Sequence, residues 1–363
     1  MLRPVDTVQK LLISTTSHFV GAFEGDGVML ALAWPGYARQ SMIRWQEGPL
    51  SRSAFVFAFE TEPIQRLPGT LIPDHSPFGD VICSYLAVLY GKRFDSHGAL
   101  ENQGSFRVPE LGSFAEPCNH LLPQNSHNLR ADFPVPLNLA EVFRIQRLIT
   151  GPLLDSRFHE TFQAAAKFYL RALQAVERDP EAAYLSLITV GEIVSNWHLF
   201  EHSTLLDADM RECLDLIRNS CPDGPRIANQ IQPRLRQIKR RFVECFVGLF
   251  DDAFFGRSEL TSEYKLEAGS FRKVLAAAYD LRSKYLHTGK PFGYWISPDT
   301  SRYETQFARP VTGDSEFDKL LAVAPTYLGL ERLTRYALLR FAQSNGAYVD
   351  PPSPPSPGST EST

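Results

Sequence analysis

The spacing of apolar residues changes its period near residue 136, and this change limits the possible folds more than any other feature of the chain. Before that point, short β-type runs such as Gly27–Leu32 and Ala54–Phe59 are separated by turn residues. After it, apolar residues recur at the three- and four-residue spacing of amphipathic helices. Strands followed by helices, rather than strands alternating with helices, predict an α+β fold with the two kinds of element segregated.

We expect three parts along the chain. Residues 1–135 form a β-rich N-terminal domain that ends in a proline-rich connector, residues 136–345 form an all-α domain, and residues 346–363 form a disordered tail rich in Pro and Ser. A chain of 363 residues is long enough for two domains that each bury a core.

Local signals place the helices. Asn138 with Glu141 makes a capping box, and Asp179 followed by Pro180 is typical of a helix N-terminus. One helix is expected in the first part, over Val81–Tyr90. The later helices are expected over Phe158–Arg178, Glu181–His202, Asp207–Arg218, Arg234–Phe250, Ser270–His287 and Thr326–Gln343.

Composition excludes several classes of protein. A net charge of −4 argues against coating of nucleic acid through bulk charge. The five cysteines include no C-x-x-C pair, which predicts reduced thiols rather than a disulfide framework or a zinc knuckle. The polar and charged residues near Met1 lead us to expect no signal peptide. The sequence contains no apolar run of the ~20 residues that a membrane span needs and no glycine-rich phosphate loop. We expect a cytoplasmic protein with no membrane partner and no cofactor.

The strongest indication of chemistry is an arginine followed five residues later by a histidine. Arg282 and His287 lie near the end of the predicted helix Ser270–His287, just before Gly289, and are the chain's only arginine and following histidine with four to six residues between them. Arginine is a permanent cation that binds phosphate, and histidine titrates near neutral pH. These are the two groups that RNA cleavage without a metal needs.

A straight helix does not direct both side chains at one phosphate. Five residues turn a helix so that the two side chains lie ~140° and ~7.5 Å apart. A symmetric dimer in which two such helices meet would line one cleft with two copies of each group. The spacing therefore favours a homodimer formed through this helix.

The segment from Ala278 to Gly289 resembles the HEPN ribonucleases, and within them the Apea-like branch. That family carries an R-x4-6-H motif at the end of a late helix in a helical bundle. The resemblance implies a metal-independent endoribonuclease that uses the RNA 2′-hydroxyl as nucleophile. His287 would be the general acid or base, and Arg282 would hold the scissile phosphate.

The resemblance also implies supporting residues and a biological role. Glu192, on an earlier helix, would face the pair, while Ser283 and Lys284 lie inside the motif. Many family toxins carry Asn, Asp or His where this chain has Ser283. Family members commonly dimerise about the motif helix and act as toxins or abortive-infection effectors against phage. The N-terminal domain would then sense a phage-derived or host trigger, or select the substrate.

A basic stretch is the predicted surface for RNA. It comprises Arg234, Arg236, Lys239, Arg240 and Arg241, with no acidic residue among them. Each phosphate that a cation neutralises adds affinity through counterion release. The alternative interpretation is a solvated helix face without a ligand.

Two alternative functions remain open. The helical domain could be a non-catalytic HEPN module that binds RNA or protein, with Arg282 and His287 forming only a solvated helix end. His198, Glu201 and His202 spell H-x-x-E-H, the inverted zinc-protease signature. On one helix the two histidines would be neighbours that could share a metal.

Overall fold

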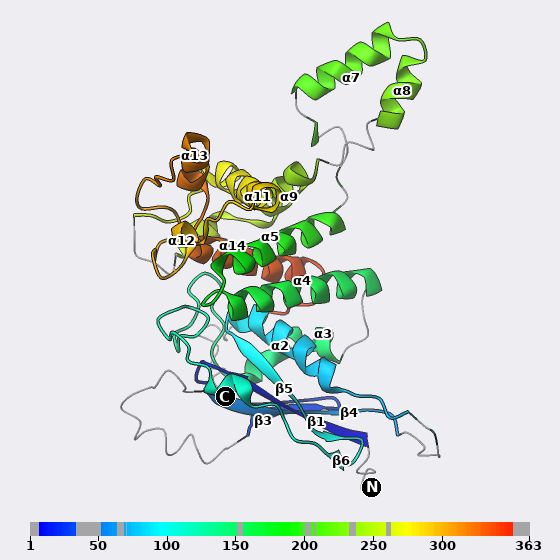
Figure 1. The fold of residues 1–363 in the computed structure, drawn as a ribbon. Helices are drawn as coiled ribbons and strands as arrows, with labels where there is room; N and C mark the ends of the chain where they lie inside the picture. Colours follow the sequence, from blue (N-terminus) through cyan, green and yellow to red (C-terminus); the bar gives the residue numbers. More distant parts are fainter. Residues whose placement is uncertain are drawn as a thin grey trace, which may run out of the picture.

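The structure is a computed structural model, and it describes residues 7–33, 52–63, 69, 71–150, 155–198, 200, 205–206, 208–231, 237–258 and 263–350. A six-stranded antiparallel sheet and a stack of helices make a mixed α+β fold, as expected from the sequence. The sheet lies at one end of the molecule, and the helices are layered on one of its faces (Figure 1).

The sheet has the strand order β2-β3-β4-β1-β5-β6. Its strands are β1 Val8–Thr15, β2 Ala22–Gly25, β3 Val28–Leu32, β4 Ser53–Glu60, β5 Phe94–Asn102 and β6 Ser105–Phe106. The predicted strands Gly27–Leu32 and Ala54–Phe59 are confirmed as β3 and β4. The run Phe19–Phe23 does not form one strand, because Val20 makes an isolated bridge to Asn138 and β2 begins only at Ala22.

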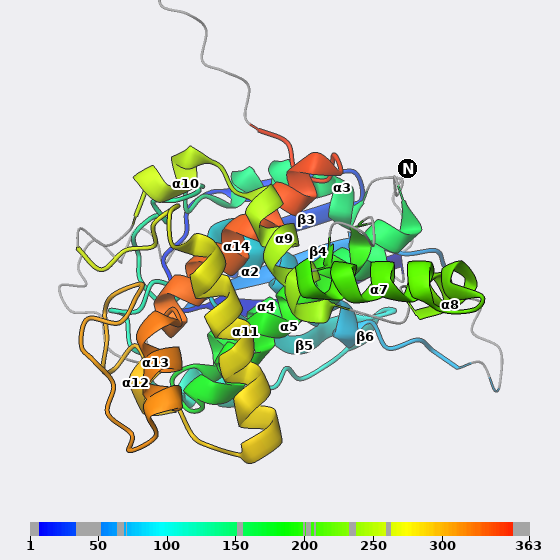
Figure 2. The same cartoon turned by 90° about the horizontal axis from the view of Figure 1, so that it is seen from above.

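The helices lie in successive layers above the sheet. Helix α2 packs on β1 and β5, α4 packs on α2, and α5 packs on α4. Helix α14 contacts α2, α4, α5 and α9, while α11 packs against α5, α9 and α13 (Figures 1 and 2). The helices are α2 Ser76–Tyr90, η3 Gly112–Ala115, η4 Leu139–Ile145, α3 Gln146–Ile149, α4 Ser156–Ala175, α5 Pro180–Trp197, α7 Ala208–Ser220, α8 Gly224–Ile231, α9 Ile238–Leu249, α10 Asp252–Gly256, α11 Phe271–Thr288, α12 Gly293–Ile296, α13 Ser315–Val323 and α14 Tyr327–Ser344.

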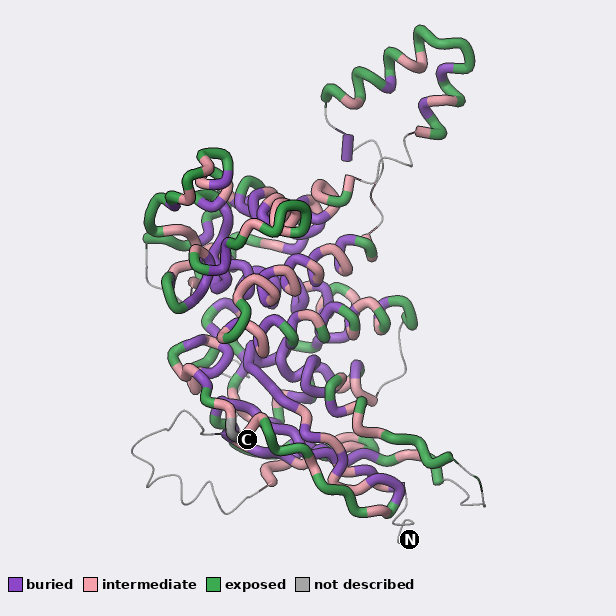
Figure 3. Tube along the Cα trace, viewed as in Figure 1, coloured by how far each residue is buried: buried purple, intermediate pink, exposed green. Residues whose placement is uncertain are grey.

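One hydrophobic core runs through sheet and helices. The same cluster of buried residues contains Leu11 and Phe57 of the sheet, Leu86 of α2, Leu173 of α4 and Leu338 of α14. Figure 3 shows this continuous buried interior. The expected division near residue 135 is therefore not visible as two separate cores among the described residues.

Buried charges reinforce the contact between the two parts of the chain. Glu331 of α14 accepts two hydrogen bonds from Arg130, at 2.8 and 2.6 Å, and a short one from Tyr169 of α4. Arg335, one helical turn later, donates to Asp132 at 3.2 Å and to the Leu89 carbonyl at the end of α2 at 2.6 Å. Because Arg130 and Asp132 lie in the proline-rich connector, that segment is part of the core and not only a link.

The expected caps and helix ends are partly confirmed. Asp179 caps α5 by accepting from the Ala182 amide. Asn138 accepts from the Ala140 amide, but it opens the 3-10 helix η4 rather than an α-helix, and the Glu141 carboxylate pairs with Arg144. The prediction that one helix reaches His202 is wrong: α5 ends at Trp197, and His198 has extended backbone (ψ 131°).

The expected tail 346–363 includes residues that pack against the core. Ala347 and Tyr348 are buried, and the Tyr348 hydroxyl accepts a hydrogen bond from Arg144 at 2.8 Å. The first residues of the predicted tail 346–363 are thus part of the packed structure, while residues 351–363 lie outside the described residues.

Helices α7 and α8 project away from the main body (Figure 1). Their contact has its own small apolar cluster of Leu206, Leu214 and Ala228. None of the helices described combines the length and the apolar character that a bilayer span requires. Cys83, Cys118 and Cys245 are buried free thiols, and Cys213 and Cys221, on the α7 side of this projection, are exposed free thiols.

Candidate active site at the end of helix α11

Helix α11 carries the arginine–histidine motif. The predicted helix Ser270–His287 is confirmed as Phe271–Thr288. Val274, Ala278 and Leu281 are buried and fix the helix against the bundle. Gly289 ends the helix in the left-handed conformation (φ 65°), which glycine adopts without a steric penalty, and its amide donates to the Tyr285 carbonyl at 2.8 Å.

Arg282 points into the bundle. Its Nη2 lies 3.2 Å from the Glu192 carboxylate of α5, and the two side chains are 26% and 18% exposed. The guanidinium also lies over the Tyr279 ring, with 5.7 Å from Cζ to the ring centroid. Burial, followed by the adjacent Glu192 carboxylate, raises the pKa of Tyr279. Glu192, Tyr279 and Arg282 thus form one polar cluster between α5 and α11.

His287 lies in the exposed last turn of α11, with Leu286 and Thr288 also exposed. Among the described residues, its ring makes no hydrogen bond and no ion pair. Within one chain, no contact joins Arg282 to His287, in keeping with the ~140° that separates positions five residues apart on a helix. His287 therefore remains available to a ligand or to a second protein surface.

The neighbours of the motif differ in their roles. Ser283 is half-buried. Lys284 and Lys290 bind the same Asp314 oxygen at 3.2 and 2.9 Å, and both ammonium groups lie over the Phe317 ring. The hydrogen bonds from Lys290, from the Phe317 amide and from Lys284 hold the pKa of Asp314 well below its usual range. Lys284 thus fixes α13 against the end of α11.

The basic stretch forms a face that is partly used within the fold. Lys239 pairs with Asp280 of α11 at 2.6 Å. Arg240 and Arg241 donate to the carbonyls of Leu205 and Ser195 at 2.8 and 3.2 Å. Arg234 and Arg236 lie outside the described residues. The described cations of this stretch therefore hold α9 to its neighbours, and they lie beside α11.

His198, the first residue of the H-x-x-E-H sequence, does not lie on a helix. His198 follows the last residue of α5, its ring lies 6.1 Å from the Phe341 ring, and burial lowers its pKa. Glu201 and His202 lie outside the described residues. Within the part of the chain that the structure describes, no three His, Cys, Asp or Glu side chains are grouped to hold a metal.

A serine–histidine pair that the sequence does not reveal lies inside the sheet. His97 of β5 contacts the Ser14 hydroxyl of β1 at 2.8 Å, and its other ring nitrogen contacts the Glu110 carbonyl at 2.7 Å. Both residues are buried, and burial lowers the pKa of His97. Because substrate cannot reach a pair sealed in this way, we assign it to the structure of the sheet.

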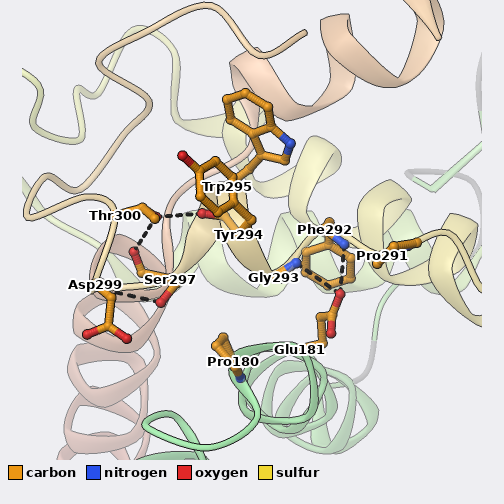
Figure 4. Close-up of a pocket in the computed structure, with 10 residues that line it drawn as sticks. All are labelled: Pro180, Glu181, Pro291, Phe292, Gly293, Tyr294, Trp295, Ser297, Asp299 and Thr300. Atoms are coloured by element: carbon orange, nitrogen blue, oxygen red, sulfur yellow. Dashed lines mark hydrogen bonds between the residues drawn. The ribbon is translucent and has the colours of Figure 1, made fainter. Parts of the chain in front are cut away.

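A pocket of about 600 Å³ is partly lined by the segment that follows α11 in the chain (Figure 4). It is formed by the start of α5, at Pro180 and Glu181, and by the segment from Pro291 to Thr300. Pro291 follows His287 by four residues. The pocket lining therefore begins shortly after the motif along the chain.

A scan of protein families, a search of curated proteins and a search of solved structures each found no match to this chain. The geometry at α11 and the resemblance in residues 278–289 are therefore the grounds on which a function can be inferred.

Proposed function

We propose that this chain is a metal-independent endoribonuclease of the HEPN type, with Arg282 and His287 as its reactive pair. The observation that carries the proposal is the difference in environment between the two motif side chains at the end of α11. Arg282 is half-buried and oriented by Glu192, while His287, one turn later, is exposed and free of protein partners among the described residues. An oriented cation and an accessible imidazole are the groups that metal-free phosphodiester cleavage requires.

The chemistry is an internal transfer at phosphorus. The 2′-hydroxyl of the RNA attacks the adjacent phosphorus, the bond from phosphorus to the 5′-oxygen breaks, and a 2′,3′-cyclic phosphate and a 5′-hydroxyl result. An imidazole takes the proton from the 2′-hydroxyl, and an imidazolium gives a proton to the departing 5′-oxygen. Arg282 stabilises the negative charge that develops on the phosphate oxygens.

A two-fold dimer about α11 supplies what one chain lacks. The cleavage needs a proton acceptor and a proton donor, and each chain contributes one His287. Two copies of α11 in contact also place an arginine of one chain near a histidine of the other, which a single straight helix does not do. We therefore include homodimerisation through α11 in the proposal.

The RNA path follows the exposed side of α11. Lys273, Lys284 and His287 lie within about 60° of one another around the helix axis. Asp280 lies in the same stripe and is paired with Lys239, and Lys284 is paired with Asp314. Lys273 would neutralise a backbone phosphate and lead the strand toward His287.

The biological role that we propose is growth arrest or defence against phage, with the sheet-containing part receiving the trigger. Its support is the resemblance of residues 278–289 to the Apea-like branch. Expression of the wild type should arrest host growth or phage propagation, and expression of His287→Ala should not.

Complementation tests the composite site. Arg282→Ala and His287→Ala should each slow cutting at least about 10²-fold. A re-annealed mixture of the two should recover a minor part of the activity, because some mixed dimers hold one Arg282 beside the one remaining His287, with water in the role of the missing second imidazole. A mixture that is no more active than the single variants would argue against a site shared between two chains. The control is a mixture of His287→Ala with a double variant that lacks both side chains, which should stay inactive.

The second candidate is a HEPN module that binds RNA or protein without cutting. The ion pair of Arg282 with Glu192 favours it, since the guanidinium charge is already compensated. RNA affinity that is retained in the wild type with no cleavage under any metal-free condition would decide for this candidate.

A further inference from the structure

Two lysines at the end of α11 share one carboxylate. Lys284 lies three residues before His287 and Lys290 three residues after it. Their ammonium groups lie 3.2 and 2.9 Å from the same Oδ2 atom of Asp314, and both lie over the Phe317 ring, 5.1 and 4.5 Å from its centroid. Among the described residues no second carboxylate forms an ion pair with either lysine. Two cations on one anion leave a positive charge uncompensated beside His287.

The two lysines and Asp314 remain open to solvent. The side chains of Lys284, Lys290 and Asp314 are 28%, 30% and 38% exposed. Ion pairs that water can reach contribute little to stability, because solvent and salt compete for the charges. An anion that arrives from solution can therefore take the place of the carboxylate.

Helix α13 is also held by contacts that do not involve the lysines. Phe317 and Leu321 are 1% and 0% exposed and belong to the main hydrophobic core. The Oδ1 atom of Asp314 accepts from the amides of Glu316 and Phe317, both at 3.1 Å, and so caps the helix. The Oδ2 atom can thus release the lysines while α13 stays in place.

We propose that Lys284 and Lys290 form a subsite for an RNA backbone phosphate, and that Asp314 occupies this subsite in the free protein. The inference rests on the proposed function, because it concerns a phosphate beside the cleaved linkage. Lysine binds phosphate as a point charge, in the way that it binds a carboxylate. Lys284 lies ~60° around the helix and ~4.5 Å along it from His287, so a phosphate held there lies next to the reacting linkage. Asp314 is then a built-in competitor that RNA displaces.

Binding measurements on the full-length protein test the subsite without cleavage. The probe is a short single-stranded RNA with 2′-O-methyl groups, whose blocked 2′-oxygens cannot attack the phosphorus. Fluorescence anisotropy in a salt series gives the affinity and its salt dependence. Asp314→Asn should tighten binding about fivefold at low salt and steepen the slope of log affinity against log salt by about 0.7, the value for one more phosphate contact in a single strand. Its thermal unfolding should not change, because asparagine also caps helices.

Substitutions of the lysines and matched controls locate the effect. Lys290→Gln should weaken binding about fivefold, and Lys290→Gln combined with Asp314→Asn should return to the wild-type affinity, because the subsite then again has one net positive charge. Glu316→Gln and Lys319→Gln change the same charges in an exposed pair of α13, 3.5 Å apart, that contacts neither subsite lysine. These controls should change the affinity by less than about twofold.

Cleavage kinetics on unmodified RNA give a second readout. Asp314→Asn should lower KM and leave kcat nearly unchanged, because the carboxylate competes with RNA for binding and takes no part in the reaction. A structural role of Asp314 alone would not lower KM.

Several outcomes would overturn the inference. These are equal RNA affinities of the wild type and Asp314→Asn, or an equal gain from Glu316→Gln. Tighter binding of a poly-glutamate peptide by Asp314→Asn, without a gain for RNA, would assign the lysines to an acidic protein segment instead. Tighter RNA binding by Asp314→Asn with a wild type that cuts no RNA would support the subsite and sink the nuclease alone. RNA cleavage with the same KM in both proteins would sink the subsite alone.

Discussion

Helices α14 and α11 each carry a charged side chain that pairs with a residue distant in the sequence. The pair of α14 is buried, and the pair of α11 is partly exposed to solvent. Glu331 of α14 is sealed in the core and accepts from Arg130 and Tyr169. Among the described residues Arg282 of α11 has one carboxylate partner, Glu192, and 26% of its side chain faces solvent. A charge enclosed by partners stabilises one arrangement of the chain, whereas a half-exposed charge beside a free imidazole can meet a ligand.

The largest effect is expected from removing the Glu331 carboxylate of α14. Glu331→Ala should lower the free energy of unfolding by about 3–5 kcal/mol, because it leaves Arg130 buried without its counter-charge. Urea denaturation measures the loss. Lys319→Ala, which removes an exposed ion pair with Glu316, should change the same quantity by less than about 0.5 kcal/mol. Equal effects of the two substitutions would mean that burial does not strengthen the interactions of Glu331.

The reciprocal test removes the α11 cation. Arg282→Ala should reduce RNA cleavage by about 10²–10³-fold through lost stabilisation of the phosphate charge. Its unfolding free energy should fall by only about 1 kcal/mol, since the pair is partly exposed. Arg282→Lys keeps the charge but not the planar fork, and should recover a minor part of the activity. A variant that loses stability and activity in parallel would make Arg282 a structural residue.

Acid should weaken the sheet region through its buried histidine. Burial lowers the pKa of His97, so the unfolded chain binds the proton more readily than the folded one. Stability is then present at pH values above the unfolded pKa of ~6.5 and is lost as the pH falls below it. His159 and His198 act in the same direction. Urea denaturation between pH 7.5 and pH 5.5 should show this fall, and it should be shallower for His97→Gln. An unchanged slope in that variant would contradict the assignment.

The smallest expected effect concerns one exposed cation of α11. Lys273→Gln should weaken RNA binding slightly and reduce the slope of log affinity against log salt by about 0.7–1, the value for one phosphate contact. The matched control is Arg226→Gln in the projecting α8, which lies away from the stripe and pairs with Asp223. A change of slope in the control but not in Lys273→Gln would place the RNA on the projection.

The sequence predicted the elements whose signals are local. Asp179 with Pro180, the apolar face of α11 and Gly289 each act within a few residues, so α5 and α11 begin where expected, and α11 also ends there. Strands β1 and β5 escaped prediction because their polar residues are satisfied by distant partners. Ser14 meets His97 across 83 residues, and Asp95 meets Arg52 across 43.

The candidate site follows the same rule. Arg282 and His287 can be found from their spacing, because the spacing is a property of one helix. The contact between Glu192 and Arg282 joins residues 90 positions apart, and only the resemblance to HEPN proteins suggested it. The pocket at 291–300 had no sequence signal, since it arises where the start of α5 meets a loop that follows α11.

The most direct test of the account is a cleavage assay on the purified full-length protein in excess EDTA. The substrates are a labelled single-stranded RNA and the DNA of the same sequence, and the proteins are the wild type and His287→Ala. We predict that the wild type cuts the RNA to products with 2′,3′-cyclic phosphate or 3′-phosphate ends and leaves the DNA intact, and that His287→Ala cuts at least about 10²-fold more slowly. Equal cutting of DNA, or equal rates for the two proteins, would contradict the account.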